Sequence, residues 1–246
     1  MAAQAKDVAR FIKDIERFLY SNLRNVLKSI ESGEAKGLEA ARILGSLETS
    51  MRELGLDKEL AVVQQIYAKD LKSITSVFNA IGTKQVFTDI DRPIVEALIK
   101  GGYDQAGAYI SRYLGDVREQ VGLQVLSGQR VDFTKIHEAE SPGLQRILET
   151  EMATTLSAFY RTVATAKGEE LGFDLYEYIG PDDNVTRRFC EQTLSRVPPI
   201  YSLDEIRKLD NEQGLPVLQY GGGYNCRHIW APISEEDARA EGWKPD

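Results

Sequence analysis

Apolar residues recur at helical spacing along the N-terminal segment. Successive members are one, three or four positions apart, which keeps them on one face of a helix and fits no strand; they are Val8, Phe11, Ile12, Ile15, Phe18, Leu19, Leu23, Val26, Leu27 and Ile30. The pattern predicts a helix over about residues 4–31, roughly 42 Å long at ~1.5 Å per residue.

Similar stripes predict four further helices, over about residues 38–54, 60–81, 93–128 and 141–163. Gly101-Gly102 is expected to break or kink the third of these, and Ser141-Pro142 to open the last, with Ser141 as its N-cap. Apolar stripes of this length bury against one another in an antiparallel bundle, which is the interpretation we favour. The alternative is that the first helix packs on a neighbouring subunit.

The last 76 residues have a different character. They hold six of the eight prolines, both tryptophans and both cysteines, and carry 8 basic against 14 acidic residues. Strands are expected at 174–179 and 228–233, and helices at 184–194, from the Ser202-Glu205 capping box to about 209, and from Ser234 to about 241. The sequence therefore predicts a mainly α protein, with an elongated helical bundle over about 1–170 and a small α+β domain over 171–246.

Charge and composition exclude several classes of protein. The net charge of −8 argues against electrostatic binding of nucleic acid or anionic lipid through a broad basic surface. No apolar run approaches the ~18 residues of a membrane span, and the N-terminus lacks the apolar core of a secretory signal, so we expect folding in a reducing cytosol. Two cysteines, Cys190 and Cys226, do not make a disulfide scaffold.

Residues that could bind a metal or take part in catalysis are concentrated near these cysteines. Cys190, Cys226 and His228 are soft ligands that would suit zinc if a turn brings them together, although a fourth ligand is missing unless Asp182, Asp183 or water supplies it. We favour two small buried hydrophobes and a hydrogen-bonded histidine, with no cofactor. Nucleophilic catalysis by a cysteine with His228 as base is a further alternative.

Other candidates for chemistry are weaker. The second histidine, His137, lies in a charged connector and is expected to be solvated. The Gly221–Gly223 run lacks the lysine and hydroxyl residues of a phosphate-binding loop, and suits a close approach to another backbone. No nucleophile elbow, dinucleotide-binding fingerprint or zinc-protease motif occurs.

Three arginines accompany the cysteines. Arg187, Arg188 and Arg227 would form either a positive pocket or internal anchors bonded to carboxylates such as Asp183, and we favour the anchors. Arg187 is expected to reach the Gly221–Cys226 loop, and Arg188 to face solvent.

Two motifs in this region resemble a known family, the phage Mu F-like minor head proteins, also called phage head morphogenesis proteins. The first is Asp-x-x-Thr-Arg with a cysteine shortly after it, and the second is Asn-Cys-Arg-(Cys/His). The matching positions, spread over about residues 173–234, are Asp183, Thr186, Arg187, Cys190, Asn225, Cys226, Arg227, His228 and Pro232. Many relatives have a C-x-x-C in the first motif and end in Cys-Arg-Cys, whereas this chain has one cysteine in each motif.

The resemblance implies a structural minor head protein of a tailed bacteriophage. Such a protein would bind at the portal or head–tail junction and act in head morphogenesis, connector assembly or DNA ejection, without catalysis. Its partners would be the portal protein, other virion subunits and further copies of itself. Contact with packaged DNA is possible, but not through a broad basic surface. No membrane contact is expected. It would reside in the virion, and in the host cytoplasm during assembly. The alternatives are a small Cys/His-dependent enzyme and a soluble helical regulator unrelated to virions.

Overall fold

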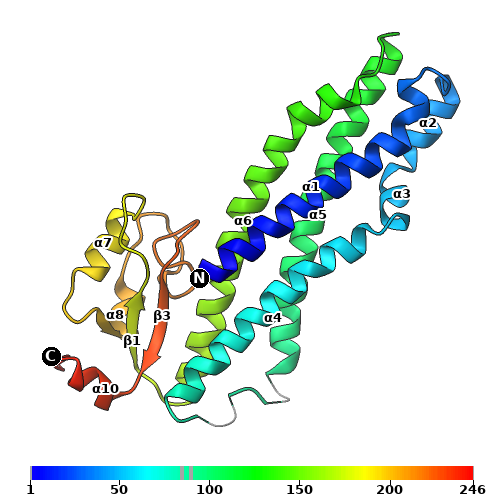
Figure 1. Cartoon of the computed structure of the whole chain (residues 1–246). Helices are drawn as coiled ribbons and strands as arrows, with labels where there is room; N and C mark the ends of the chain where they lie inside the picture. Colours follow the sequence, from blue (N-terminus) through cyan, green and yellow to red (C-terminus); the bar gives the residue numbers. More distant parts are fainter. Residues whose placement is uncertain (1, 84–85, 89–90, 246) are drawn as a thin grey trace. The chain divides into compact units, whose positions relative to one another are not determined.

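The structure is a computed structural model that describes residues 2–83, 86–88 and 91–245. Met1 and Asp246, the outer ends of the two expected regions, lie outside the described residues. The chain is mainly helical with a small three-stranded sheet near its C-terminus, as expected (Figure 1). The elements are α1 (Ala2–Glu31), α2 (Gly37–Gly45), α3 (Leu47–Glu53), α4 (Leu56–Ala80), α5 (Arg92–Leu126), α6 (Phe133–Glu170), β1 (Leu175–Ile179), α7 (Arg188–Leu194), β2 (Ile200–Ser202), α8 (Leu203–Lys208), α9 (Val217–Tyr220), β3 (Ile229–Ile233) and α10 (Glu235–Ala240).

The chain forms two compact units. The helical unit consists of Ala2–Ile66 and Lys100–Glu149, and the sheet unit contains Tyr67–Ile99 and Thr150–Asp246. Each of α4, α5 and α6 contributes residues to both units. The sheet unit therefore includes the C-terminal part of α6, which the sequence pattern assigns to the helical region.

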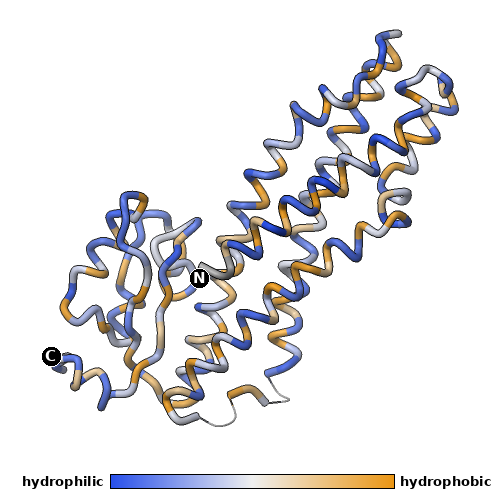
Figure 2. Tube along the Cα trace, viewed as in Figure 1, coloured by the Kyte–Doolittle hydropathy of each residue, from blue (hydrophilic) through white to orange (hydrophobic). Residues whose placement is uncertain are grey.

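The stripe of α1 is buried within the chain. Leu19, Leu23 and Leu27 have no exposed surface, and Phe11 is 3% exposed. Figure 2 shows that apolar and polar residues also alternate along the other long helices. The core interpretation of this stripe is confirmed. None of the helices in the described ranges combines the length and apolar character that crossing a membrane requires.

Two expected boundaries in the helical region are wrong. The helix expected over 38–54 divides at Ser46, whose φ of −98° and ψ of 8° depart from helical values. At Gly101-Gly102, where a break or a kink was expected, α5 continues as one helix, so the expected break is absent. Glycine costs a helix only about 1 kcal/mol relative to alanine, which the rest of a 35-residue helix outweighs.

The start of α6 and the surroundings of His137 also differ from expectation. The helix begins at Phe133, so Ser141 is no N-cap and Pro142 lies inside the helix. Asp132 precedes the first turn and accepts the Lys135 N–H at 3.2 Å, which satisfies a free donor at the helix start. His137 is consequently on a helix and buried, with Nδ1 2.6 Å from the Tyr113 hydroxyl. The prediction of a solvated histidine is wrong because this ring is part of the core.

The sheet has the strand order β2-β1-β3, and both pairings are antiparallel. Alternate residues of β1 face opposite sides, as a pleated strand requires. Tyr176 and Tyr178 join Tyr201 and Trp230 in a buried cluster on one side, and Leu175 packs with Ile200, Ile233 and Ala238 in a second cluster.

Helix caps in the sheet unit agree with the sequence signals. Ser202 and Glu205 form both bonds of a capping box at the start of α8, and the Ser234 side chain accepts the Asp237 N–H at the start of α10. The helix expected at 184–194 begins only at Arg188, because the preceding residues form a turn that is closed by side chains.

Candidate functional site

The first motif begins with this turn. The Asp183 N–H donates to Thr186 Oγ1 at 2.9 Å, and the Thr186 N–H donates to the Asp183 carbonyl at 2.8 Å. The Thr186 hydroxyl donates in turn to the carbonyl of Pro181 at 3.1 Å. The Asp-x-x-Thr spacing therefore specifies a local backbone shape.

An ion pair joins the first motif to the second. Nη1 and Nη2 of Arg227 donate to the two carboxylate oxygens of Asp183 at 2.7 and 2.5 Å. Hydrogen bonding from Arg227 holds the pKa of the Asp183 carboxyl well below its usual value. Both side chains are about 40% exposed, so the pair orients the two motifs more than it stabilises them.

Arg187 contacts a carbonyl, not a carboxylate. Its Nη1 donates to the carbonyl of Gly222 at 2.9 Å, which confirms the predicted reach to the Gly221–Cys226 loop. Of the three arginines considered as anchors for a carboxylate such as Asp183, Arg227 makes that pairing, at an exposed position. Arg188 is exposed, as expected.

The glycines of the loop are required by the sulfurs beneath them. A Cβ on Gly222 would collide with Cys190 Sγ, and a Cβ on Gly221 would lie 2.9 Å from Cys226 Sγ. Gly221 and Gly223 also have positive φ values, of 54° and 98°. The loop thus approaches two cysteine side chains and not the expected backbone, and the Gly222 N–H donates to Cys226 Sγ at 3.2 Å.

Asn225 positions the second motif. It has a φ of 57°, in the left-handed region that asparagine tolerates better than most residues. Its N–H donates to Thr154 Oγ1 of α6 at 3.0 Å. Asparagine at this position is therefore explained by backbone shape.

The structure brings Cys190, Cys226 and His228 together in the interior of the sheet unit. The two sulfurs are 3.8 Å apart, and Cys226 Sγ is 3.8 Å from His228 Nδ1. One ligand atom from each residue lies within 4.8 Å of the other two. The three residues are 2–4% exposed, and both cysteines are free thiols.

The two thiols have different proton affinities. Hydrogen bonding between them lowers the pKa of Cys226 and raises that of Cys190; contact with His228 and the charge of Arg161 lower the pKa of Cys226 further. These contacts make Cys226 the more acidic thiol of the two.

Two residues of the site lie outside the two sequence motifs. Tyr178 lies on β1, with its hydroxyl 3.3 Å from Cys190 Sγ and 3.6 Å from Cys226 Sγ. Its ring stacks on His228 with centroids 5.0 Å apart and an interplanar angle of 11°. The period-two pattern of the strand marks Tyr178 as inward-facing, but nothing in the sequence links it to the cysteines.

The second is Arg161 of α6, which is 1% exposed. Its guanidinium donates three hydrogen bonds of 2.8 Å, to the carbonyls of Gln219, Cys226 and His228. These bonds fix the second motif to α6. An arginine on the buried face of an otherwise ordinary helix gives no sequence signal that distinguishes it from a surface residue.

A cavity of about 230 Å³ adjoins the sulfurs and the imidazole. Its lining consists almost entirely of motif residues: Val185, Thr186, Arg187, Cys190, Asn225, Cys226, Arg227 and His228.

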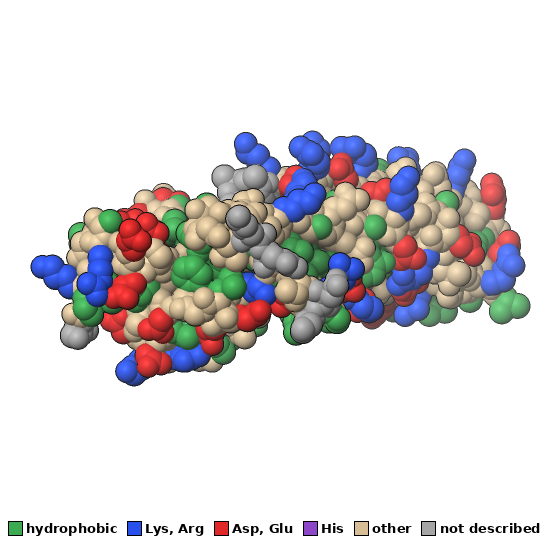
Figure 3. Space-filling view, turned by 90° about the horizontal axis from the view of Figure 1, so that it is seen from below, with side chains coloured by type: hydrophobic (Ala, Val, Ile, Leu, Met, Phe, Trp, Pro, Cys, Tyr) green, Lys and Arg blue, Asp and Glu red, His purple; other side chains and the backbone are tan. Residues whose placement is uncertain are grey.

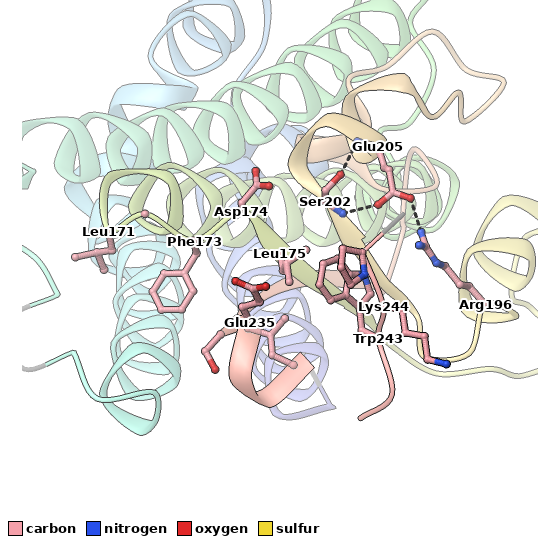
Figure 4. A pocket seen from close by; sticks show the side chains of 14 residues that line it. Leu171, Phe173, Asp174, Leu175, Arg196, Ser202, Glu205, Glu235, Trp243 and Lys244 are labelled. Carbon is pink, nitrogen blue, oxygen red and sulfur yellow. Dashed lines mark hydrogen bonds and ion pairs between the residues drawn. The ribbon is translucent and has the colours of Figure 1, made fainter. Parts of the chain in front are cut away.

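A larger cavity of about 590 Å³ lies elsewhere in the sheet unit (Figure 4). Leu175, Trp243 and Lys244 are among its lining residues, together with Glu205, which accepts bonds from the Ser202 N–H and from Arg196, each at 2.7 Å. None of the motif residues lines it.

Three side chains are therefore suited to hold a metal ion, namely those of Cys190, Cys226 and His228. Of the carboxylates considered as a fourth ligand, Asp183 is committed to Arg227, and Asp182 is exposed.

Protein-family models, curated proteins and solved structures give no match to this chain.

Proposed function

We propose that this chain is a structural minor head protein of a tailed bacteriophage, bound at the portal or head–tail junction. It acts by binding, in head morphogenesis, connector assembly or DNA ejection. Its expected partners are the portal protein, other virion subunits and further copies of itself. The basis is the likeness of its two motifs to those of the Mu F-like minor head proteins.

The observation that carries the proposal is that the residues of this likeness bond to one another. Asp183 pairs with Arg227, Arg187 donates to Gly222, and Cys190 lies against Cys226. Each contact joins a residue of the first motif to a residue in the segment 222–227, which lies at least 35 residues further along the sequence. Motif residues in this arrangement stabilise the fold of a small domain. This favours a binding role for the domain over a catalytic one.

The distribution of charge is compatible with protein partners. On the face shown in Figure 3, Lys and Arg side chains are interspersed with Asp and Glu. An interface of mixed sign suits a protein surface better than the phosphate backbone of DNA.

The rival function is a small enzyme that uses Cys226 and His228. The lowered pKa of Cys226 and the adjoining cavity favour it. Burial of the sulfur argues against it, since Cys226 is 4% exposed and its Sγ already accepts the Gly222 N–H.

Co-expression with the portal protein of the same genome tests the proposal. The full chain should co-purify with assembled portal rings, and Cys226→Ala, if folded, should do so as well, because no turnover is involved. Failure of the wild-type chain to bind the portal or any other head protein of that genome would contradict the proposal. Rapid, stoichiometric alkylation of Cys226 in the native protein would favour the enzyme.

A further inference from the structure

Two of the three distances among the buried ligands match a tetrahedral zinc site, and the third pair, Cys190 Sγ and the His228 imidazole, lies within 4.8 Å. With Zn–S distances of about 2.3 Å and Zn–N distances of about 2.0–2.1 Å, tetrahedral geometry places two sulfurs about 3.8 Å apart and a sulfur about 3.6 Å from a nitrogen. The corresponding distances here are 3.8 Å between the sulfurs and 3.8 Å from Cys226 Sγ to His228 Nδ1. Two sulfurs at this separation are too far apart for a disulfide, whose S–S bond is about 2.05 Å.

The surroundings of Cys226 favour the ligating form of its sulfur. The Gly222 N–H donates to Cys226 Sγ, and the fixed positive charge of Arg161 lies nearby. Both favour the thiolate, which is the form that binds metal. Thiols are weak hydrogen-bond partners, so bonds between them give little reason to bury two cysteines against a histidine.

Packing sets the orientation of the imidazole. Tyr178 stacks on one face of the His228 ring, and the backbone of Gly180 approaches the ring too closely to leave room for a Cβ. The ring is thereby held with Nδ1 toward Cys226 Sγ, while Nε2 is buried without a partner among the described residues. Nδ1 is therefore the nitrogen that faces the sulfur.

The remaining coordination position is accessible. The cavity of about 230 Å³ is lined by all three ligands and can hold water. No fourth protein ligand is then needed, and neither Asp182 nor Asp183, which is paired with Arg227, lines the cavity.

We propose that Cys190, Cys226 and His228 bind one zinc ion, with water from the cavity as the fourth ligand. Two soft sulfur donors and one imidazole in a closed interior suit Zn²⁺ better than magnesium or calcium, which prefer oxygen. The ion would join the first motif to the second at a single point. The inference does not depend on the virion function and holds for either rival.

Metal analysis of the full-length protein, purified without a metal-binding tag, tests the inference. We expect about one zinc per chain. After removal of zinc by a chelator, Co²⁺ should produce the absorption of a tetrahedral site and the charge-transfer band of thiolate ligation, and added Zn²⁺ should raise the melting temperature.

Variants identify the ligands. His228→Gln and Cys190→Ser should weaken zinc binding at least about tenfold, since even the loss of a group that only orients a ligand has that effect. The matched control is His137→Gln, the same change at a buried histidine in the helical unit, and it should leave zinc binding unchanged. If the ligand variants do not fold, the cobalt spectrum of the wild-type protein decides alone. A wild-type chain without zinc and without a thiolate–cobalt band, or folded ligand variants that bind zinc as tightly as wild type, would overturn the inference.

Discussion

Arg187 and Arg188 are adjacent in sequence but have different roles. Arg187 is half-buried and donates to Gly222, whereas Arg188 is exposed. A hydrogen bond from a charged donor contributes about 1.5–3 kcal/mol when its loss leaves the acceptor unpaired, and an exposed arginine contributes about 0–1 kcal/mol. Arg187→Ala should therefore lower the free energy of unfolding of the sheet unit more than Arg188→Ala. Tryptophan fluorescence reports on this unit, because it contains both tryptophans. Equal, small effects of the two substitutions would instead assign Arg187 to a binding surface.

The Asp183–Arg227 pair should make stability depend on acid pH. The pKa of Asp183 is lowered in the folded state, so the unfolded chain takes up this proton first. The contribution is present above the unfolded pKa, near 3.8, and is lost as pH falls through the folded value. Wild type should thus be more stable than Asp183→Asn at neutral pH, and the difference should shrink below about pH 4. Denaturant unfolding of both proteins across this range measures it. A difference that is independent of pH would show that the ion pair does not persist in solution.

Among the elements, those defined by local signals are the ones that the sequence predicts. The Ser202-Glu205 box and the Ser234 cap depend on residues three apart, and both form as expected. The predicted start of α6 at Ser141 is wrong. The Ser-Pro signal at 141–142 is outweighed by the burial of Phe133, His137 and Ser141. Propensity is a weak prior wherever tertiary packing opposes it.

His137 links α5 to α6 and should make the helical unit sensitive to pH. Burial lowers the pKa of this histidine, against the opposing charges of Glu16 and Glu138. The unfolded chain then binds the proton more tightly, so stability is full above about pH 6.5 and falls as pH decreases. In His137→Gln this loss should be smaller between about pH 7 and 5. Circular dichroism during denaturant unfolding at each pH gives the slopes. Parallel slopes for the two proteins would mean that His137 titrates normally.

At the scale of the whole molecule, the sequence predicts the helical and the α+β character but not where the compact units divide. The motif residues could be found from their spacing, and Arg187 reaches the loop that was expected. Arg161 and Thr154 could not be found, because their partners are more than 55 residues away and are backbone groups. Such contacts depend on where the C-terminal part of α6 lies beside the second motif, which no local pattern encodes.

These contacts predict that residues 171–246 do not fold alone. Without Arg161, the carbonyls of Cys226 and His228 lose their donor in the interior, at about 1–3 kcal/mol each, and the carbonyl of the exposed Gln219 loses its donor as well. A fragment of 171–246 should therefore lack the fluorescence of a buried Trp230 and the dispersed amide signals of the full chain. Arg161→Met in the full chain should weaken the same unit without removing α6. A well-folded 171–246 fragment would show that α6 is dispensable to the domain.

The most direct test of the proposed virion role is mass spectrometry of purified virus particles produced by cells whose genome encodes this chain. The proposal predicts that the protein is present after gradient purification, in a fixed ratio to the portal protein. It also predicts that the protein remains with the particle through washes that remove loosely attached host proteins. Absence from washed particles, with the chain abundant in the cytoplasm of the same cells, would contradict the proposal and favour the enzyme or the soluble regulator.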